Sequence, residues 1–267
     1  MRRWVATFAL LGAAWLASAA PTRIASYSPG ATRTLVDFGA ADQVVAATRW
    51  CPLPASHPAA RDCDVFNPDL ERLLRTKPDL VILPRTSNPL WAERCRGAGL
   101  KVLVLNPEND QSVLGDIRLI GAALGRSAEA IQRLTRPLEG IPAQVPRKLL
   151  IVWDGMMAGP DSYLGVVLRS AGFQSALPKG SWVKLDWETM AQADPEVILW
   201  VDSLPADGPI AYAQKRQAEM AQVSVIKGLK LMNSGLIFRT PSGSQWLPGS
   251  GLTEVIPKLQ DLRDKLR

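Results

Sequence analysis

The sequence predicts an α/β protein of two Rossmann-like lobes joined by a single long backbone helix, with a ligand cleft between the lobes. A repeat is the main observation: NPDLERLLRTKPDLVIL at residues 67–83 returns in similar form as KLDWETMAQADPEVILW at residues 184–200. Each copy predicts a short helix that ends before a proline and leads into a buried strand. The chain of 267 residues is long enough for two such lobes, each with its own core.

The N-terminal lobe is expected over residues 20–110, as strands that alternate with helices. Its strands are short apolar runs bounded by turn residues. The first helix follows a Ser-Pro-Gly turn and ends at Gly39. The predicted strands are Arg23–Tyr27, Gln43–Ala47, Leu80–Leu83 and Lys101–Leu105, and the predicted helices are Ala31–Phe38, the first repeat helix and one that ends near Gly97.

The connecting helix is expected over residues 111–141, because apolar residues recur at helical spacing from Leu114 to Leu134. Gly125-Arg126-Ser127 interrupts this pattern, and Pro137 and Pro142 end it. The C-terminal lobe is expected over residues 142–267. Its predicted strands are Lys148–Trp153, Val197–Val201 and Leu236–Arg239, and its predicted helices are Tyr163–Ala171, the second repeat helix and one from about Leu252 to Leu266.

The N-terminus predicts export. Arg2 and Arg3 precede an apolar stretch that ends in small residues, which is the pattern of a secretory signal peptide over residues 1–19, cleaved after about Ala19. An uncleaved anchor is the alternative. The formal net charge is +6, but the basic residues are interspersed with acids, so we expect no nucleic-acid partner.

The cysteines leave the redox state open. Cys51 and Cys63 flank a loop rich in proline and alanine, and an oxidising compartment would allow a disulfide between them. Cys95 falls in a predicted helix and is expected to be a free thiol, although three cysteines allow three single pairings. With His57 as the one histidine and no CxxC motif, we expect neither a metal site nor a cofactor.

Candidate ligand-binding residues follow the strands, because open α/β sheets bind ligands at the carboxyl ends of their strands. Tryptophan is frequent among them, and a flat indole gives a large contact area to a large rigid ligand. Trp187 and Trp200 are expected in the core instead, and a core role is the alternative for each of the others. The candidates are Tyr27, Ser28, Pro29, Arg49, Trp50, Phe66, Arg85, Thr86, Trp153, Met156, Trp182, Ser203 and Trp246.

The chain resembles a known family. RIASYSPGATRTLVDFGAADQVVAATRWC, then NPDLERLLRTKPDLVIL, GLKVLVL and IRLIGAALG, and later WETMAQADPEVIL, are similar to the periplasmic substrate-binding proteins of the ABC importers for vitamin B12, ferric siderophores and haem. The resemblance implies a monomeric periplasmic protein that is not an enzyme. It also implies an inner-membrane permease dimer as partner, which Glu71 and Glu188 would contact, one from each lobe. A favourable first-turn charge is the alternative for both glutamates.

The ligand implied by the resemblance is a metal chelate, with a corrinoid such as vitamin B12 as the first candidate, because its bulk suits aromatic walls. A ferric siderophore is the runner-up, since anionic siderophores usually need several converging cations and only Arg49, Arg85 and Arg239 are expected near the site. Haem would need an axial ligand, for which only Tyr27 is placed well. Two alternatives from other classes are an exported enzyme, with Ser28 or His57 in its mechanism, and a ligand sensor without a permease.

Overall fold

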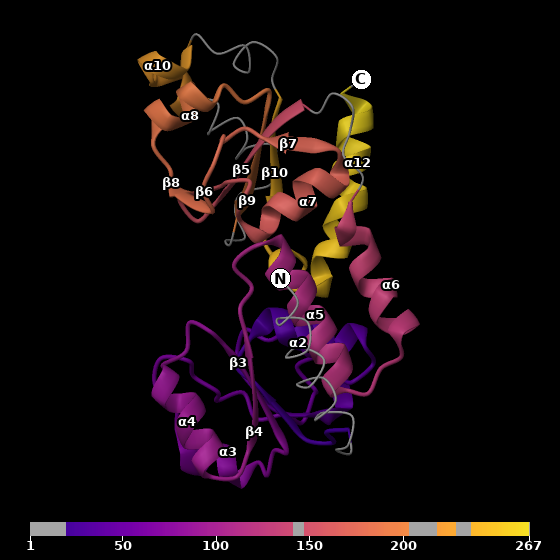
Figure 1. Ribbon diagram of the computed structural model, residues 1–267. Coiled ribbons are helices and arrows are strands. Elements are labelled where there is room, and N and C mark those ends of the chain that lie inside the picture. The colour runs from indigo at the N-terminus through magenta and orange to yellow at the C-terminus, as the bar shows by residue number, and fades with distance from the viewer. Residues whose placement is uncertain (1–19, 141–146, 203–217, 228–235, 267) are drawn as a thin grey trace, which may run out of the picture. The chain divides into compact units, whose positions relative to one another are not determined.

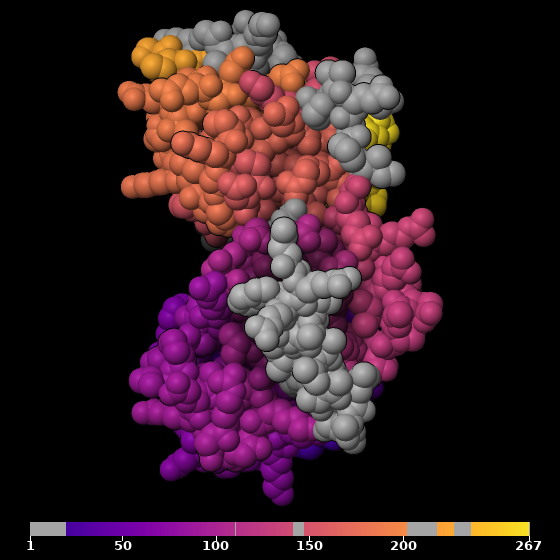
Figure 2. Space-filling model, in the orientation of Figure 1, coloured from indigo at the N-terminus to yellow at the C-terminus, as the bar shows by residue number. Residues whose placement is uncertain are grey.

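The computed structural model describes residues 20–140, 147–202, 218–227 and 236–266, and these form two compact units. Unit 1 contains the chain up to Pro107 together with Ser112–Arg136 and Leu247–Gly251, and the rest forms unit 2. Side chains fill the spaces between the ribbons of Figure 1 within each unit (Figure 2). The predicted signal peptide lies outside the described residues. Within the described ranges no helix is both long and apolar enough to cross a membrane.

Unit 1 is built on a four-stranded parallel sheet in the order β2-β1-β3-β4. Strands β1, β2 and β3 are almost entirely buried and mostly apolar, as expected for a parallel sheet that is covered on both faces, whereas the edge strand β4 exposes Lys101 and Val104. The elements are β1 (Ile24–Ser26), α2 (Pro29–Asp37), a 3-10 turn at Ala41–Gln43, β2 (Val44–Ala47), α3 (Leu70–Arg75), β3 (Leu80–Pro84), α4 (Pro89–Gly97) and β4 (Lys101–Leu105), close to the predicted bounds.

Helices α3 and α4 cover one face of this sheet (Figure 1). Leu73 from α3 and Trp91 and Cys95 from α4 pack there against Val81 and Leu83 of β3. The ring of Tyr27, directly after β1, meets the ring of Trp91 edge-on with centroids 6.0 Å apart. Tyr27 is therefore part of the core of unit 1.

The single connecting helix predicted over residues 111–141 is wrong: the structure has two helices, α5 (Asp110–Ala123) and α6 (Ala128–Glu139). Gly125 adopts a left-handed conformation with φ +64°, and the N–H of Arg126 donates to the carbonyl of Gly121, which is the Schellman ending of a helix. Ser127 then caps α6 by accepting from the N–H of Ala130 at 3.3 Å. A side chain at Gly121 would collide with Ile131, so the two helices pack closely.

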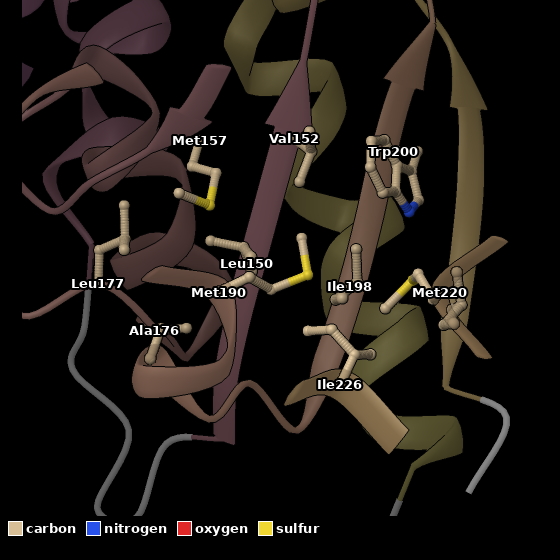
Figure 3. Close-up of a cluster of buried hydrophobic side chains, with 12 residues drawn as sticks. Leu150, Val152, Met157, Ala176, Leu177, Met190, Ile198, Trp200, Met220 and Ile226 are labelled. Carbon is tan, nitrogen blue, oxygen red and sulfur yellow. The ribbon is translucent and has the colours of Figure 1, made fainter. Parts of the chain in front are cut away.

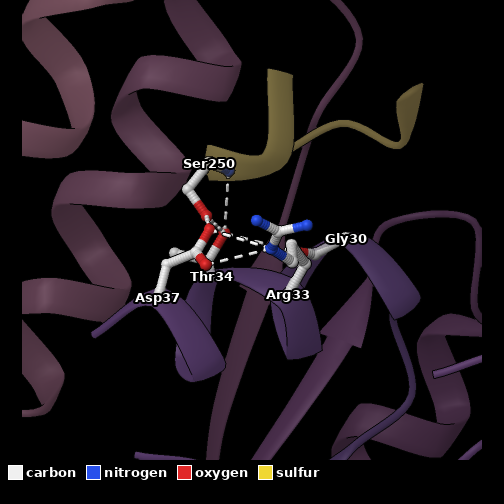
Figure 4. A network of polar contacts seen from close by, with 5 residues as sticks. All are labelled: Gly30, Arg33, Thr34, Asp37 and Ser250. Atoms are coloured by element: carbon white, nitrogen blue, oxygen red, sulfur yellow. Dashed lines mark hydrogen bonds and ion pairs between the residues drawn. The ribbon is translucent and has the colours of Figure 1, made fainter. Parts of the chain in front are cut away.

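The segment Leu247–Gly251 also packs in unit 1, although the sequence places it in the C-terminal lobe. Figure 4 shows how Ser250 meets helix α2. The hydroxyl of Ser250 donates to Asp37 at 2.6 Å, and its N–H donates to the hydroxyl of Thr34 at 3.1 Å. Asp37 is itself paired with Arg33 at 3.0 Å. Gly30 has no room for a side chain, because a Cβ there would lie 2.2 Å from the carbonyl oxygen of Pro248.

Unit 2 has a mixed sheet in the order β10-β9-β5-β6-β8, and β7 pairs with β5. Strands β9, β10, β5 and β7 are parallel, whereas β6 runs antiparallel to both of its neighbours. The strands are β5 (Arg147–Trp153), β6 (Met156–Ala158), β7 (Phe173–Ser175), β8 (Trp182–Lys184), β9 (Val197–Asp202) and β10 (Ile237–Pro241). Strands β6, β7 and β8 were not predicted from the sequence.

One face of this sheet carries the core cluster of Figure 3, in which Leu150, Val152 and Trp200 meet Met190 of α8 (Trp187–Ala193) and Ile226 of α10 (Ser224–Lys227). The predicted core positions of Trp200 and Trp187 are confirmed, since Trp200 is buried and Trp187 packs against the cluster. Helix α7 (Tyr163–Ala171) packs against α12 (Val255–Lys265) and is almost wholly buried. Two 3-10 turns, Ser244–Trp246 and Ser250–Glu254, precede α12.

The two copies of the repeat adopt the same local structure. Asp69 caps α3 by accepting from the N–H of Arg72 at 3.0 Å, and Asp186 caps α8 by accepting from the N–H of Thr189 at 2.8 Å. A left-handed residue precedes the proline in both, Lys77 with φ 47° and Asp194 with φ 44°. The acid after each proline accepts from a backbone N–H at the start of the neighbouring strand: Asp79 from Thr22 and Arg23, and Glu196 from Lys148. The predicted duplication is confirmed.

Candidate ligand-binding site

Eight of the predicted ligand-binding residues belong to unit 1. Because its strands are parallel, their carboxyl ends lie at one edge of the sheet. The loops after β1, β2 and β3 therefore begin side by side. They carry Tyr27, Ser28 and Pro29 after β1, Arg49 and Trp50 after β2, and Arg85 and Thr86 after β3, while Phe66 lies in the loop that leads to α3.

The exposed members of this set all stand on loops. The indole of Trp50 is 70% exposed, and the guanidinium of Arg49 lies 4.9 Å above its ring in a cation–π contact. Arg85 and Thr86 are exposed as well. Phe66 is 97% exposed, and its N–H donates to the carboxylate of Asp64 at 2.8 Å. This edge of unit 1 thus combines flat aromatic surface with positive charge.

Tyr27 and Ser28 are buried, contrary to their predicted place in the binding site. Tyr27 is 2% exposed, and burial followed by the nearby Cys63 thiol raises the pKa of its hydroxyl. Its ring packs on Trp91 because the apolar face of the sheet continues past β1. Ser28 accepts from the N–H of Ala31 at 3.3 Å as the N-cap of α2, so its hydroxyl serves the helix. Pro29 is half-buried at the first position of that helix.

Three of the predicted residues of unit 2 come together. Trp153 pairs with Met156 across the β5–β6 hairpin, and Trp182 of β8 pairs with Ala158 two residues further along β6. Side chains alternate along a strand, so Trp153, Met156 and Trp182 share one face, opposite to Val152 and Met157 of the core. The rings of Trp153 and Trp182 meet edge-on at 6.5 Å, and all three side chains are half-buried.

Tyr163 completes this aromatic face, with its ring 5.6 Å from that of Trp182. It is buried at the start of α7, and burial raises the pKa of its hydroxyl. The predicted residue Trp246 is 3% exposed, so its indole is a core side chain rather than a surface for a ligand. Ser203 lies outside the described residues.

The three cysteines are free and buried in this structure, so the disulfide that the sequence allows between Cys51 and Cys63 is not formed here. The thiol of Cys51 lies 3.0 Å from the hydroxyl of Thr32 on α2. Cys63 packs with Tyr27, and burial raises the pKa of its thiol to about 12. Burial also raises the pKa of Cys95, to about 11. Each thiol thus has its own surroundings in unit 1.

Both ring nitrogens of His57 are hydrogen-bonded to the backbone. One ring nitrogen, Nε2, lies 3.0 Å from the carbonyl oxygen of Ala41, and the other, Nδ1, accepts from the N–H of Ala59 at 3.2 Å. Within the described ranges no group of three or more histidine, cysteine, aspartate or glutamate side chains could hold a metal ion.

Two features of the site were not predicted from the sequence. Arg61 is half-buried and donates to three backbone carbonyls of the loop that follows Trp50, at 2.8 to 3.0 Å; no local sequence signal marks such a role. The hairpin that brings Trp153 and Met156 together turns at Asp154-Gly155, with φ 46° and 74°. Asp-Gly between apolar residues is a strong hairpin signal, so this feature could have been predicted.

The predicted docking glutamates occupy equivalent positions. Glu71 and Glu188 are both exposed in the first turn of their helices, two residues after the capping aspartate. The hydrogen bond from the Arg72 N–H holds the pKa of Asp69 below its usual value, and the hydrogen bonds from Thr189 do the same for Asp186. Each unit thus presents one exposed acid beside a negatively charged helix cap.

The sequence and the fold are similar to those of known proteins. A family model described as "Periplasmic binding protein" matches residues 24–242. A cobalamin-binding protein of Halobacterium salinarum is 24% identical over 257 residues, which cover 90% of this chain and 68% of that protein. An uncharacterized ABC transporter substrate-binding lipoprotein of Bacillus subtilis, YvrC, is 22% identical over 86% of this chain and 77% of its own length.

Solved structures have the same fold. The periplasmic heme-binding protein HutB of Vibrio cholerae superposes with a TM-score of 0.72 at 21% identity, over 92% of this chain and 98% of that one. The predicted α/β fold class is confirmed by this likeness. The family and these neighbours are substrate-binding proteins of transport systems and not enzymes. The family model matches most of the chain, and the chain therefore belongs to the periplasmic binding protein family.

Proposed function

We propose that this protein captures a corrinoid such as vitamin B12 in the periplasm and delivers it to an ABC importer. The observation that carries the proposal is the accessible indole surface in each unit: Trp50 beneath Arg49 in unit 1, and Trp153 with Trp182 in unit 2. A corrinoid is large and rigid, and flat indoles contact such a ligand with little loss of side-chain entropy. The similarity to a cobalamin-binding protein over 90% of the chain supports the same ligand.

A corrinoid fits the residues better than haem does. Haem iron needs an axial ligand such as a tyrosine or histidine. The hydroxyl of Tyr27 is buried against Cys63, and both ring nitrogens of His57 are hydrogen-bonded to the backbone. Neither residue can coordinate iron without leaving these contacts. A ferric siderophore is the second candidate, because the exposed Arg49 and Arg85 would attract an anionic chelate.

The test of the ligand is a tryptophan-fluorescence titration of the mature protein with cobalamin, cobinamide, haem and a panel of ferric siderophores, corrected for absorption. We expect saturable one-to-one quenching by the corrinoids. Trp50→Ala and Trp182→Ala should each weaken binding about tenfold or more, as substitutions of aromatic hot spots do. Leu90→Ala is a control, since Leu90 is 58% exposed in unit 1 and belongs to neither set of binding residues. If only siderophores bind, the proposed ligand changes from a corrinoid to a ferric siderophore.

We propose that Glu71 and Glu188 contact the two halves of the permease. Their equivalent, exposed positions in the repeat suit a two-fold partner, and charge pairs of this kind fix register and raise the association rate. Glu71→Lys with Glu188→Lys should abolish corrinoid uptake by cells while leaving corrinoid affinity unchanged. Glu93→Lys, at another exposed acid of unit 1, is the control. Normal uptake by the double variant would favour a ligand sensor that does not use these acids.

Two further expectations belong to this proposal. The signal peptide should be removed after about Ala19, which N-terminal sequencing of the exported protein would check. The mature protein should be a monomer, which light scattering would measure.

A further inference from the structure

Trp50 stands on a loop whose two sides are anchored, although its own side chain is exposed. On the near side, the hydroxyl of Thr48 accepts from the N–H of Trp50 at 3.2 Å, and the carbonyl of Thr48 accepts from the N–H of Cys51 at 3.1 Å. On the far side, the thiol of Cys51 is buried 3.0 Å from the hydroxyl of Thr32. An exposed tryptophan on a loop would ordinarily sample many orientations, but these contacts restrict the backbone that carries it.

Arg61 reaches the same loop from further along the chain. Its Nη1 donates to the carbonyl of Cys51 at 2.9 Å, and its Nη2 donates to the carbonyls of Leu53 and Pro54 at 2.8 and 3.0 Å. The planar guanidinium can bond several carbonyls at once from a fixed fork, which a lysine ammonium cannot reproduce. One side chain therefore binds the backbone of the first four residues after Trp50 at three carbonyls.

The backbone around Arg61 is fixed in turn to the edge strand β2. The N–H of Ala47 donates to the carbonyl of Ala60 at 2.7 Å, and the N–H of Cys63 donates to the carbonyl of Ala47 at 3.2 Å. Residues 60–63 thus lie along β2 as a short extension of the sheet. The backbone of Arg61 is held beside β2, and its guanidinium binds the loop that follows Trp50. Arg61 therefore fixes that loop relative to the sheet.

We propose that Arg61 is a positioning residue for ligand recognition, and that it acts by holding the Trp50 loop in its binding conformation. This inference rests on the proposed function, in which Trp50 contacts the chelate. A pre-organised loop loses less conformational entropy on binding than a mobile one. Loss of the Arg61 hydrogen bonds therefore weakens binding without removal of any ligand contact.

The test is a double-mutant cycle measured by calorimetric titration with cobalamin, or with whichever panel member binds the wild type. Arg61→Ala should weaken binding about tenfold when Trp50 is present and have almost no effect in the Trp50→Ala background, because residues that act through one contact are not additive. Hydrogen exchange at the Trp50 and Cys51 amides should become faster in Arg61→Ala.

Arg61→Lys covers the case in which Arg61→Ala does not fold: it keeps the charge, and its affinity should fall between those of the wild type and of Arg61→Ala. Arg72→Ala is the matched control, since Arg72 makes an exposed ion pair with Asp62 at 3.2 Å in the same part of unit 1. Equal weakening by Arg61→Ala with and without Trp50 would overturn the inference and leave the proposed function intact. Failure of the wild type to bind any chelate would overturn both.

Discussion

Unit 1 presents its aromatic side chains on loops, whereas unit 2 presents them on the face of a sheet. Trp50 and Phe66 of unit 1 are 70% and 97% exposed, but Trp153 and Trp182 of unit 2 are half-buried and touch each other. The repeat helices and strands are alike in the two units, so the difference comes from the loops of unit 1 and the additional strands of unit 2. An all-parallel sheet offers loops at its edge, while the antiparallel β6 and β8 offer a further surface.

This difference predicts that the exposed tryptophan of unit 1 and the packed tryptophans of unit 2 contribute differently to ligand binding and to stability. In unit 1 we expect Trp50 to contribute to ligand binding and little to stability, because its indole is exposed. In unit 2 we expect Trp153 and Trp182 to contribute both to ligand binding and to stability, because their side chains are packed against each other and half-buried. Substitutions should therefore separate binding from stability in unit 1 and not in unit 2.

The largest effect on stability is expected at Gly30, where the close contact with Pro248 leaves no room for a side chain. Gly30→Ala places a methyl group 2.2 Å from the carbonyl oxygen of Pro248, which must shift. We expect a loss of about 3 kcal/mol in the free energy of unfolding, at the upper end for overpacking. Denaturant unfolding followed by circular dichroism would measure it. Gly115→Ala is the control, because a methyl group at this position of α5 meets nothing within 4 Å and alanine favours a helix. Equal stability of the two variants would contradict the packing of Leu247–Gly251 on α2.

The next effect on stability is expected to differ between the exposed tryptophan of unit 1 and the packed tryptophan of unit 2. Trp182→Ala should lower the free energy of unfolding by about 2 kcal/mol, less than for a fully buried tryptophan, because it loses its contacts with Trp153 and Tyr163. Trp50→Ala should change stability by less than about 0.5 kcal/mol, as exposed substitutions do. Both are measured by denaturant unfolding. Trp182→Phe should recover part of the loss, and similar losses at Trp50 and Trp182 would refute the distinction.

A smaller effect concerns the one acid among the buried described residues, Asp116 of α5. Burial raises its pKa to about 6, while its Oδ1 accepts from the N–H of Asn106 at 3.2 Å and its Oδ2 is unpaired. A raised carboxyl pKa destabilises the fold as pH rises from about 4 to 6, and the cost is complete above pH 6. Asp116→Asn should therefore gain stability relative to the wild type over this interval. Thermal unfolding from pH 4 to 8 would measure the gain, and a difference independent of pH would contradict the assignment.

The smallest effect should be the same in both units. Asp69→Ala and Asp186→Ala each remove a helix cap, and the two losses of stability should match because the cap geometry is the same. Since the pKa of each aspartate is lowered in the folded state, the stability that they contribute is present near neutral pH and is lost as pH falls through the folded pKa. Thermal unfolding at pH 7 and pH 3 would compare them, with Asp→Asn as the variant that keeps a cap. Unequal losses would mean that the copies differ beyond their local structure.

Local signals accounted for most of the fold. Strands β1, β2, β3, β4, β5, β9 and β10 and the repeat helices lie within a few residues of their predicted bounds, because their apolar runs and caps are read over a short stretch of chain. The three missed strands are each three residues long, too short to show a period. The break at Gly125 was visible as a Gly-x-Ser interruption, but the helical pattern on both sides of it was read as continuous.

Local sequence patterns are enough to predict the duplicated α/β architecture, the capped repeat helices and the exposure of Glu71 and Glu188, because each depends on residues within one turn or one strand. The accessibility of the residues after the strands depends on tertiary packing: Tyr27 and Trp246 are core side chains, whereas Trp50 is exposed. Tertiary packing also decides that the thiols stay apart, that Leu247–Gly251 packs on α2 and that Arg61 holds the Trp50 loop. Burial and these contacts join residues far apart in the chain, and no local pattern encodes such a meeting.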